Sequence, residues 1–97
     1  MPLFTSHELE NATRLLPDWK VDSEALQRSF DFVDFVAAMR FVNHVAALAE
    51  QHGHHPDIDI RYNRVLIRTW SHDSGGVTER DLQLASAMDR LLLLRAC

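Results

Sequence analysis

The chain has 97 residues, enough for one domain, and we expect a single domain over 1–97. Acidic residues outnumber lysine and arginine by 14 to 10, and the net charge of -4 lacks the basic surface expected of a nucleic-acid binder. No apolar run is long enough to span a bilayer, the first ten residues lack the pattern of a secretory signal, and a single cysteine, Cys97, excludes an intrachain disulfide, so we expect a cytoplasmic protein with no membrane partner.

The first part of the chain predicts a helix followed by two short strands. Thr5, with Glu8 three residues later, is typical of a capping box at the start of a helix. Pro17 is expected to end this helix, because proline cannot continue the backbone hydrogen-bond ladder. Imperfect alternation then predicts strands over 19–21 and 25–32 around an Asp-Ser-Glu turn.

A long second helix is predicted from Asp34, its cap, to about His52, and Gly53 suits the left-handed position just past its end. This helix carries two apolar stripes. The first comprises Phe35, Val36, Met39, Val42, Ala46 and Ala49, and the second comprises Phe41, Val45 and Leu48. A small domain cannot cover apolar residues on every side, so we expect one stripe to face the core and the other to face another subunit.

Two alternating segments, 58–62 and 65–70, predict a β-hairpin with Asn63 and Arg64 as its two-residue turn. The pairing that this turn implies places His55 opposite His72 at the open end of the hairpin. One face carries the apolar side chains that the helices should cover, Ile58, Ile60, Val65 and Ile67. The other face should meet water and carries Asp59, Arg61 and Arg68, with Asp59 opposite Arg68.

A third helix is predicted after the break at Gly75 and Gly76, beginning at Thr78 with Asp81 and ending in the leucine run at 91–94. The order is therefore helix, strand, strand, helix, strand, strand, helix. This order predicts an α+β fold with two layers, in which a four-stranded antiparallel sheet has three helices packed on one face.

Six histidines are present, and four of them lie between His52 and His72. Imidazole suits proton transfer because its ordinary pKa, about 6.5, lies near working pH. A zinc site is an alternative, since the run from His52 to His55 with Asp57 nearby supplies the nitrogen and carboxylate ligands that zinc favours.

The segment from Glu50 to Pro56, an acid followed by three residues and His-His-Pro, resembles the signature of the pterin-4a-carbinolamine dehydratases. Further matches are Leu15-Leu16-Pro17-Asp18-Trp19, Phe30-Asp31-Phe32, Tyr62, His72, Gly76-Val77-Thr78 and Asp81, so the resemblance covers about 5–92. One departure is Trp70, which stands where many members of that family have a small residue such as serine or threonine.

The resemblance implies a catalytic set and a substrate-binding set. The catalytic set is His54, His55 and His72, and the substrate-binding set is Glu50, Ser71 and Asp81. The family reaction removes water from a 4a-hydroxy-tetrahydropterin, so an acid must protonate the departing hydroxide and a base must take a proton from a ring nitrogen. We expect His54 and His55 to do most of this work and His72 to orient the substrate or share the proton.

The pterin supplies the electron push, so no metal or other cofactor is expected. Purely structural interpretations of two of these residues are also possible. Asp81 would then only cap the third helix with Thr78, and Glu50 would be an ordinary surface acid.

Family members are homodimers or homotetramers that serve pterin recycling beside an aromatic amino-acid hydroxylase. The resemblance therefore implies a homo-oligomer with a pterin substrate. Some members also bind a homeodomain transcription factor and stabilise its dimer. Two alternatives to the enzyme therefore stay open: a non-catalytic interaction protein, and a degenerate relative that keeps the fold without the activity.

Overall fold

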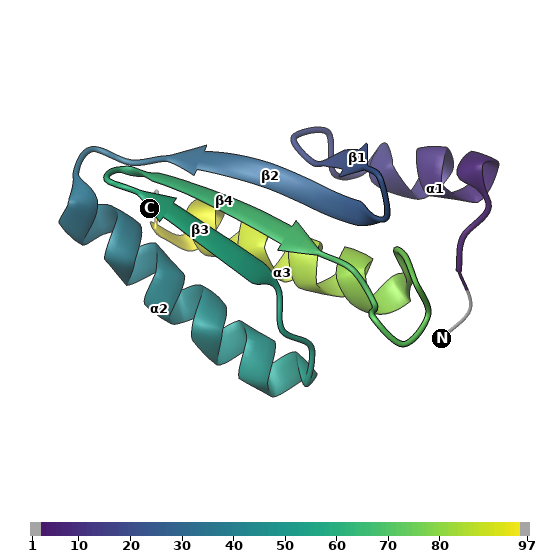
Figure 1. The fold of residues 1–97 in the computed structure, drawn as a ribbon. Coiled ribbons are helices and arrows are strands. Elements are labelled where there is room, and N and C mark those ends of the chain that lie inside the picture. The colour runs from purple at the N-terminus through teal and green to yellow at the C-terminus, as the bar shows by residue number, and fades with distance from the viewer. Residues whose placement is uncertain (1–2, 96–97) are drawn as a thin grey trace.

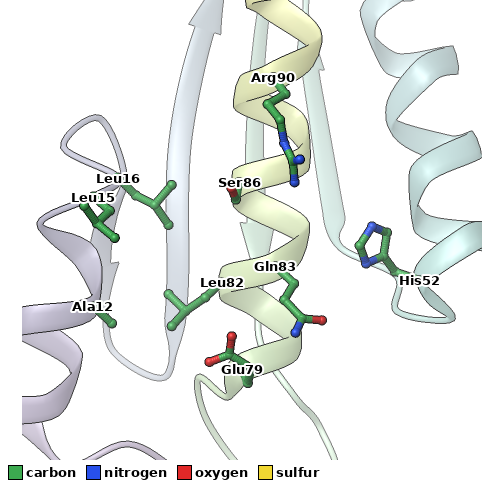
Figure 2. Close-up of a pocket in the computed structure, with 9 residues that line it drawn as sticks. All are labelled: Ala12, Leu15, Leu16, His52, Glu79, Leu82, Gln83, Ser86 and Arg90. Atoms are coloured by element: carbon green, nitrogen blue, oxygen red, sulfur yellow. The ribbon is translucent and has the colours of Figure 1, made fainter.

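The computed structural model describes residues 3–95 of the chain. The helices are α1 (Ser6–Thr13), α2 (Phe35–His52) and α3 (Glu79–Arg95), and the strands are β1 (Lys20–Asp22), β2 (Ala25–Asp31), β3 (Asp57–Arg61) and β4 (Arg64–Thr69). The strands form one antiparallel sheet in the order β1-β2-β4-β3 (Figure 1). The helices lie on one side of it, with α3 between α1 and α2 (Figure 2). The predicted α+β fold is therefore confirmed.

The predicted helix starts are confirmed. The backbone N–H of Glu8 donates to the Thr5 hydroxyl at 3.1 Å, and the backbone N–H of Thr5 donates to the Glu8 carboxylate at 2.9 Å. Two hydrogen bonds with Thr5 lower the pKa of the Glu8 carboxyl group from its ordinary value of 4.5. The bond from the Thr5 backbone has the larger effect, and the bond with the Thr5 side chain has the smaller one. Asp34 caps α2 by accepting from the backbone N–H of Ala37 at 2.8 Å.

The predicted end of α1 is wrong, because α1 ends at Thr13, before Pro17 is reached. The backbone N–H of Leu16 donates to the carbonyl of Thr13, three residues back, so the chain makes a tighter turn there instead of a further helical turn.

The core lies between the sheet and the helices and decides which stripe of α2 is internal. Phe41 and Val45 of the second stripe have no exposed surface, whereas Phe35 and Val36 of the first stripe are 48% and 56% exposed. The ring of Phe41 packs against Phe30 of β2 with centroids 4.6 Å apart. The second stripe therefore faces the core, and the start of the first stripe faces outward.

The β3–β4 hairpin has a different register from the one predicted. Its turn consists of Tyr62 and Asn63, and Arg61 rather than Tyr62 begins the pairing, opposite Arg64. Tyr62 takes the left-handed conformation, with φ at 50°. A long-range contact explains this turn, because the side-chain amide of Asn63 donates to the carbonyl of Phe32 at 2.8 Å and the Asn63 carbonyl accepts from the Phe32 N–H.

The corrected register moves each residue of β3 by two positions relative to β4, so every side chain stays on its predicted face. Asp57, rather than Asp59, is opposite Arg68. The prediction that His55 lies opposite His72 is therefore wrong.

None of the three helices within residues 3–95 combines the length and the apolar character needed to cross a membrane.

Candidate active site

Three predicted histidines, His54, His55 and His72, line one open hollow of about 310 Å³. It lies at the end of the sheet where the chain enters β3 and leaves β4. Its other lining residues are Gly53, Trp70, Asp73 and Arg80. Two segments that are separated in the sequence therefore bring the imidazoles to one hollow, whose volume is at the small end of the range for ligand sites.

The turn after α2 sets the direction of His54. Gly53 has φ at 61°, a conformation that glycine adopts without strain. The backbone N–H of His54 then donates to the carbonyl of Ala49 at 3.1 Å. The residue is only 7% exposed, and its Nε2 lies 2.6 Å from Oδ1 of Asp81. The turn therefore directs the first imidazole inward, toward the start of α3.

Asp81 has no exposed surface and accepts several hydrogen bonds. The hydroxyl of Thr69 donates to Oδ1 at 2.6 Å, and the hydroxyl of Ser71 and the backbone N–H of Thr78 donate to Oδ2 at 3.0 and 2.9 Å. A carboxylate surrounded by donors acts only as an acceptor, so we assign the ring hydrogen of His54 to Nε2. This assignment leaves Nδ1 of His54 free to exchange a proton.

Ser71 was expected to bind substrate, and the structure places it behind His54 with 1% exposure. Its hydroxyl lies 2.7 Å from that of Thr78 as well as 3.0 Å from Asp81. Ser71 and Asp81 therefore have almost no surface to offer a substrate. Their contacts hold the imidazole of His54 in place, as outer hydrogen-bond partners do in other sites.

His55 and Glu50 form an exposed pair at the rim of the hollow. The Nε2 of His55 lies 2.5 Å from Oε2 of Glu50, and the two side chains are 66% and 76% exposed. Glu50 occupies the last turn of α2, so its carboxylate lies near His55, which follows the turn at Gly53. A pair this exposed adds little to stability, so its groups are available to a ligand.

His72 is held outward by a tight loop at the end of β4. The backbone N–H of Ser71 donates to the carbonyl of Gly76 at 2.8 Å, and the Ser71 carbonyl accepts from the N–H groups of Ser74, Gly75 and Gly76. Gly75 takes a left-handed φ of 76° to close the loop. The loop therefore exposes the imidazole while it buries the serine before it.

Sequence reasoning missed two of the residues at the hollow, Asp73 and Arg80. The Nη1 of Arg80 lies 3.8 Å from Oδ2 of Asp73, and both side chains are substantially exposed. A signal was present in the sequence, because Arg80 directly precedes Asp81 at the start of α3 and Asp73 directly follows His72. The hollow is therefore also lined by a guanidinium and a carboxylate that are exposed and can form hydrogen bonds.

The predicted alternative of a zinc site requires ligands that converge on one point. Over residues 3–95, no group of three or more His, Cys, Asp or Glu side chains converges closely enough to hold a metal ion. His54 turns inward to Asp81 and His55 turns to Glu50, so the ligands of the expected set point to different partners. Cys97 lies outside the described residues.

A larger hollow, about 510 Å³, lies along α3 (Figure 2). His52 reaches toward it from the end of α2, Leu15 and Leu16 reach in from the segment after α1, and Arg90 lies on α3 itself. This hollow contains none of the predicted catalytic or substrate-binding residues. The smaller hollow gathers three imidazoles with carboxylate partners, so we take it as the candidate active site despite its smaller volume.

The fold and the site together define a small α+β protein with three histidines around one hollow at the end of its sheet. The chain belongs to the pterin 4 alpha carbinolamine dehydratase family, whose model matches residues 2–91.

The relatives and the solved structures agree with this assignment. A protein of Acidobacterium capsulatum named "Putative pterin-4-alpha-carbinolamine dehydratase" is 51% identical over 92 residues, covering 95% of this chain and all of its own length. A protein of the same name from Chloroflexus aurantiacus is 47% identical over 92 residues, covering 95% of this chain and 99% of its own.

Among solved structures, a transcriptional coactivator/pterin dehydratase from Brucella melitensis has a TM-score of 0.86 and 40% identity, with 91% of this chain and 96% of that chain covered. A pterin dehydratase-like protein described as a RuBisCO assembly factor in the alpha-carboxysome has a TM-score of 0.63 and 24% identity, with 75% and 84% covered. At that identity the second likeness concerns the fold alone.

Proposed function

We propose that this chain dehydrates a 4a-hydroxy-tetrahydropterin to the quinonoid dihydropterin and water. The single observation that carries the proposal is the meeting of His54, His55 and His72 at one hollow, with the first held by a buried carboxylate. The names of the family and of its members supply the substrate class. We also propose a role in pterin recycling in the cytoplasm, beside a hydroxylase that forms the carbinolamine, as the resemblance to the family implies.

His54 is the proposed base. Asp81 accepts the hydrogen on Nε2, so Nδ1 presents a lone pair that can take a proton from a ring nitrogen of the substrate. As that proton leaves, the electron pair forms the new double bond between N5 and C4a. The buried carboxylate stabilises the positive charge that His54 then carries, as in other imidazole–carboxylate pairs.

His55 is the proposed acid. Hydroxide is a poor leaving group, so the bond between C4a and oxygen breaks as an imidazolium gives its proton to that oxygen and water departs. Glu50 supports this role, since a carboxylate beside Nε2 stabilises the charged ring before the transfer. Proton uptake by His54 and proton release by His55 balance, so the enzyme needs only a proton exchange with water to return to its starting state.

His72, Asp73 and Arg80 are proposed to bind and orient the ring. The pterin has an amine edge that donates hydrogen bonds and a carbonyl that accepts them, and the carboxylate of Asp73 and the guanidinium of Arg80 match these groups. Orientation of the ring should also lower the activation barrier, because it removes the entropy cost of bringing the substrate and the imidazoles together.

The test is a stopped-flow assay of synthetic 4a-hydroxy-tetrahydropterin with the wild-type chain and the variants His54→Ala and His55→Ala. We expect the wild type to exceed the buffer rate and each variant to lose roughly 10²- to 10⁴-fold in kcat, the range for a lost general acid or base. His44→Ala is the matched control, because His44 is an exposed histidine of α2 outside the hollow. It should keep the full rate.

A wild-type chain that only matches the buffer rate would remove the enzyme proposal. The chain would then be a non-catalytic interaction protein or a degenerate relative on the same fold. Equal rates for wild type and both alanine variants, above buffer, would instead show that other groups carry the proton transfers.

A further inference from the structure

Trp70 occupies a position in the hollow that the proposed chemistry does not use. It is half-buried, lines the hollow with the three histidines, and comes directly after the end of β4. Its ring lies against that of His72, with centroids 4.0 Å apart and ring planes 40° apart. An indole is the largest flat surface that a side chain can offer, so its place beside the imidazoles calls for an explanation.

The open end of the β3–β4 hairpin brings Trp70 to the same hollow as the imidazoles. The pairing of β3 with β4 ends at Asp57 and Arg68, so His55 lies two residues beyond it on one segment and Trp70 two residues beyond it on the other. His72 lies two residues further along, in the turn that the bridge between Ser71 and Gly76 closes, and its ring lies against the indole. The indole therefore contacts one exposed imidazole, that of His72, and lines the same hollow as the other, that of His55.

The chemistry of the surrounding groups indicates a flat and polar guest. Asp73 and Arg80 offer hydrogen bonds at the rim, while Trp70 offers an uncharged aromatic face. A bicyclic heteroaromatic ring has a π-face to stack and polar edges to pair, and stacking on an aromatic side chain tolerates any such ring.

We propose that Trp70 is the platform on which the pterin ring stacks in this chain, with the reacting edge of the ring turned toward the imidazoles. The proposal rests on the proposed function for its ligand and assigns the binding surface that the acid–base residues do not supply. In this role Trp70 is a binding residue, and its loss weakens the affinity for the ring more than it slows the chemistry of the bound substrate.

A purely structural role is the competing account, and it makes a different prediction. Extending the pairing of Leu26 with Thr69 by one residue places Ala25, which has no exposed surface, beside Trp70. If the indole served only to cover Ala25, its replacement would lower stability and leave the affinity for a pterin unchanged.

The experiment measures binding of 7,8-dihydrobiopterin, an unreactive dihydropterin, by isothermal titration calorimetry. Trp70→Leu keeps apolar bulk and removes the aromatic face, so we expect its Kd to rise about 5- to 150-fold, the range that loss of one stacked ring gives. Trp70→Phe should keep most of the affinity. The control is Phe35→Leu, which removes an exposed aromatic ring from the opposite end of α2 and should bind as wild type.

A second measurement needs no substitution. The chain has two tryptophans, and the indole N–H of Trp19 is fixed by its hydrogen bond to Asp89 at 2.8 Å. In a titration of the wild type followed by NMR, the indole signal of Trp70 should shift with added dihydropterin while that of Trp19 stays. An unmoved Trp70 signal in a protein that binds dihydropterin overturns the proposal even if Trp70→Leu does not fold, as does an unchanged Kd in a folded Trp70→Leu variant.

The outcomes separate this inference from the proposed function. Dehydration by the wild type with an unmoved Trp70 signal rejects the platform and keeps the enzyme. Binding through Trp70 without any dehydration rejects the enzyme and keeps the platform.

Discussion

Asp81 connects His54, the proposed base, to the rest of the protein. Its carboxylate accepts from the end of β4 through Thr69, from the start of α3 through Thr78 and from the turn after α2 through His54. A buried acceptor with several donors is costly to disturb, because each donor left without a partner carries a desolvation penalty. We therefore assign Asp81 a positioning role, since it acts on the substrate only through His54.

Replacement of Asp81 by asparagine tests that role. The amide keeps the shape but turns a donor toward groups that already donate, so we expect a loss of about 1–3 kcal/mol in the free energy of unfolding. We also expect kcat to fall by at least tenfold with KM little changed, because the ring nitrogen that carries the hydrogen is no longer fixed. Denaturant titration and steady-state kinetics measure the two effects.

Thr69→Val is the matched control for that variant. It removes one hydrogen bond to Asp81 in the same buried place and leaves the contact with His54 intact. It should lower stability while kcat stays within a fewfold of wild type. Similar losses of kcat in both variants would show that Asp81 acts through general stability alone.

At the scale of elements, the turn after α2 directs His54 and His55 to different partners. Gly53 holds a left-handed φ of 61°, after which His54 faces inward and His55 faces Glu50. A β-carbon on Gly53 would meet no atom within 4 Å, so only the backbone conformation requires glycine there.

Gly53→Ala should therefore lower the free energy of unfolding by about 1–2 kcal/mol, the cost of a left-handed alanine. It should also lower kcat, because relief of that strain rotates the two imidazoles away from their partners. Urea denaturation and the dehydration assay check both effects, and Gln51→Ala, an exposed change in the same helix end, should alter neither. Unchanged stability would show that the turn adapts without cost.

The features that depend on neighbours in the chain could be predicted from the sequence, and the features that depend on long-range contacts could not. The caps at Thr5, Asp34 and Gly53 were predictable because each is a bond between neighbours in the chain. The hairpin turn was not, because Asn63 is held by Phe32 of a distant segment. The family signature indicated the three histidines, but the burial of His54 and the exposure of His55 and His72 depend on packing that no short pattern encodes.

For the whole molecule, the start of α2 presents an apolar surface with nothing over it in the chain described. Val33, Phe35 and Val36 are 86%, 48% and 56% exposed and lie together at the junction of β2 and α2. Exposed apolar patches of this kind are typical of contacts between subunits. We expect them to form part of a homodimer or homotetramer interface.

Sedimentation velocity tests this expectation. The wild type should sediment well above its monomer mass of 11.2 kDa, and Val36→Glu should shift it toward the monomer, because a charge would be buried at the contact. Gln83→Glu places the same charge on an exposed position of α3 and should leave the assembly intact. A wild type that sediments as a monomer contradicts the prediction.

The buried histidine, His54, and the exposed histidine, His55, should differ in how they are retained in other proteins with this fold. A protein that had lost the reaction would still have a structural reason to keep His54 and Asp81, because both are buried and each is the polar partner of the other. It would have no such reason to keep His55 and Glu50, which support little besides each other. In a survey of sequences, a protein that has replaced His55 and Glu50 but kept His54 and Asp81 would therefore be expected to have lost the activity.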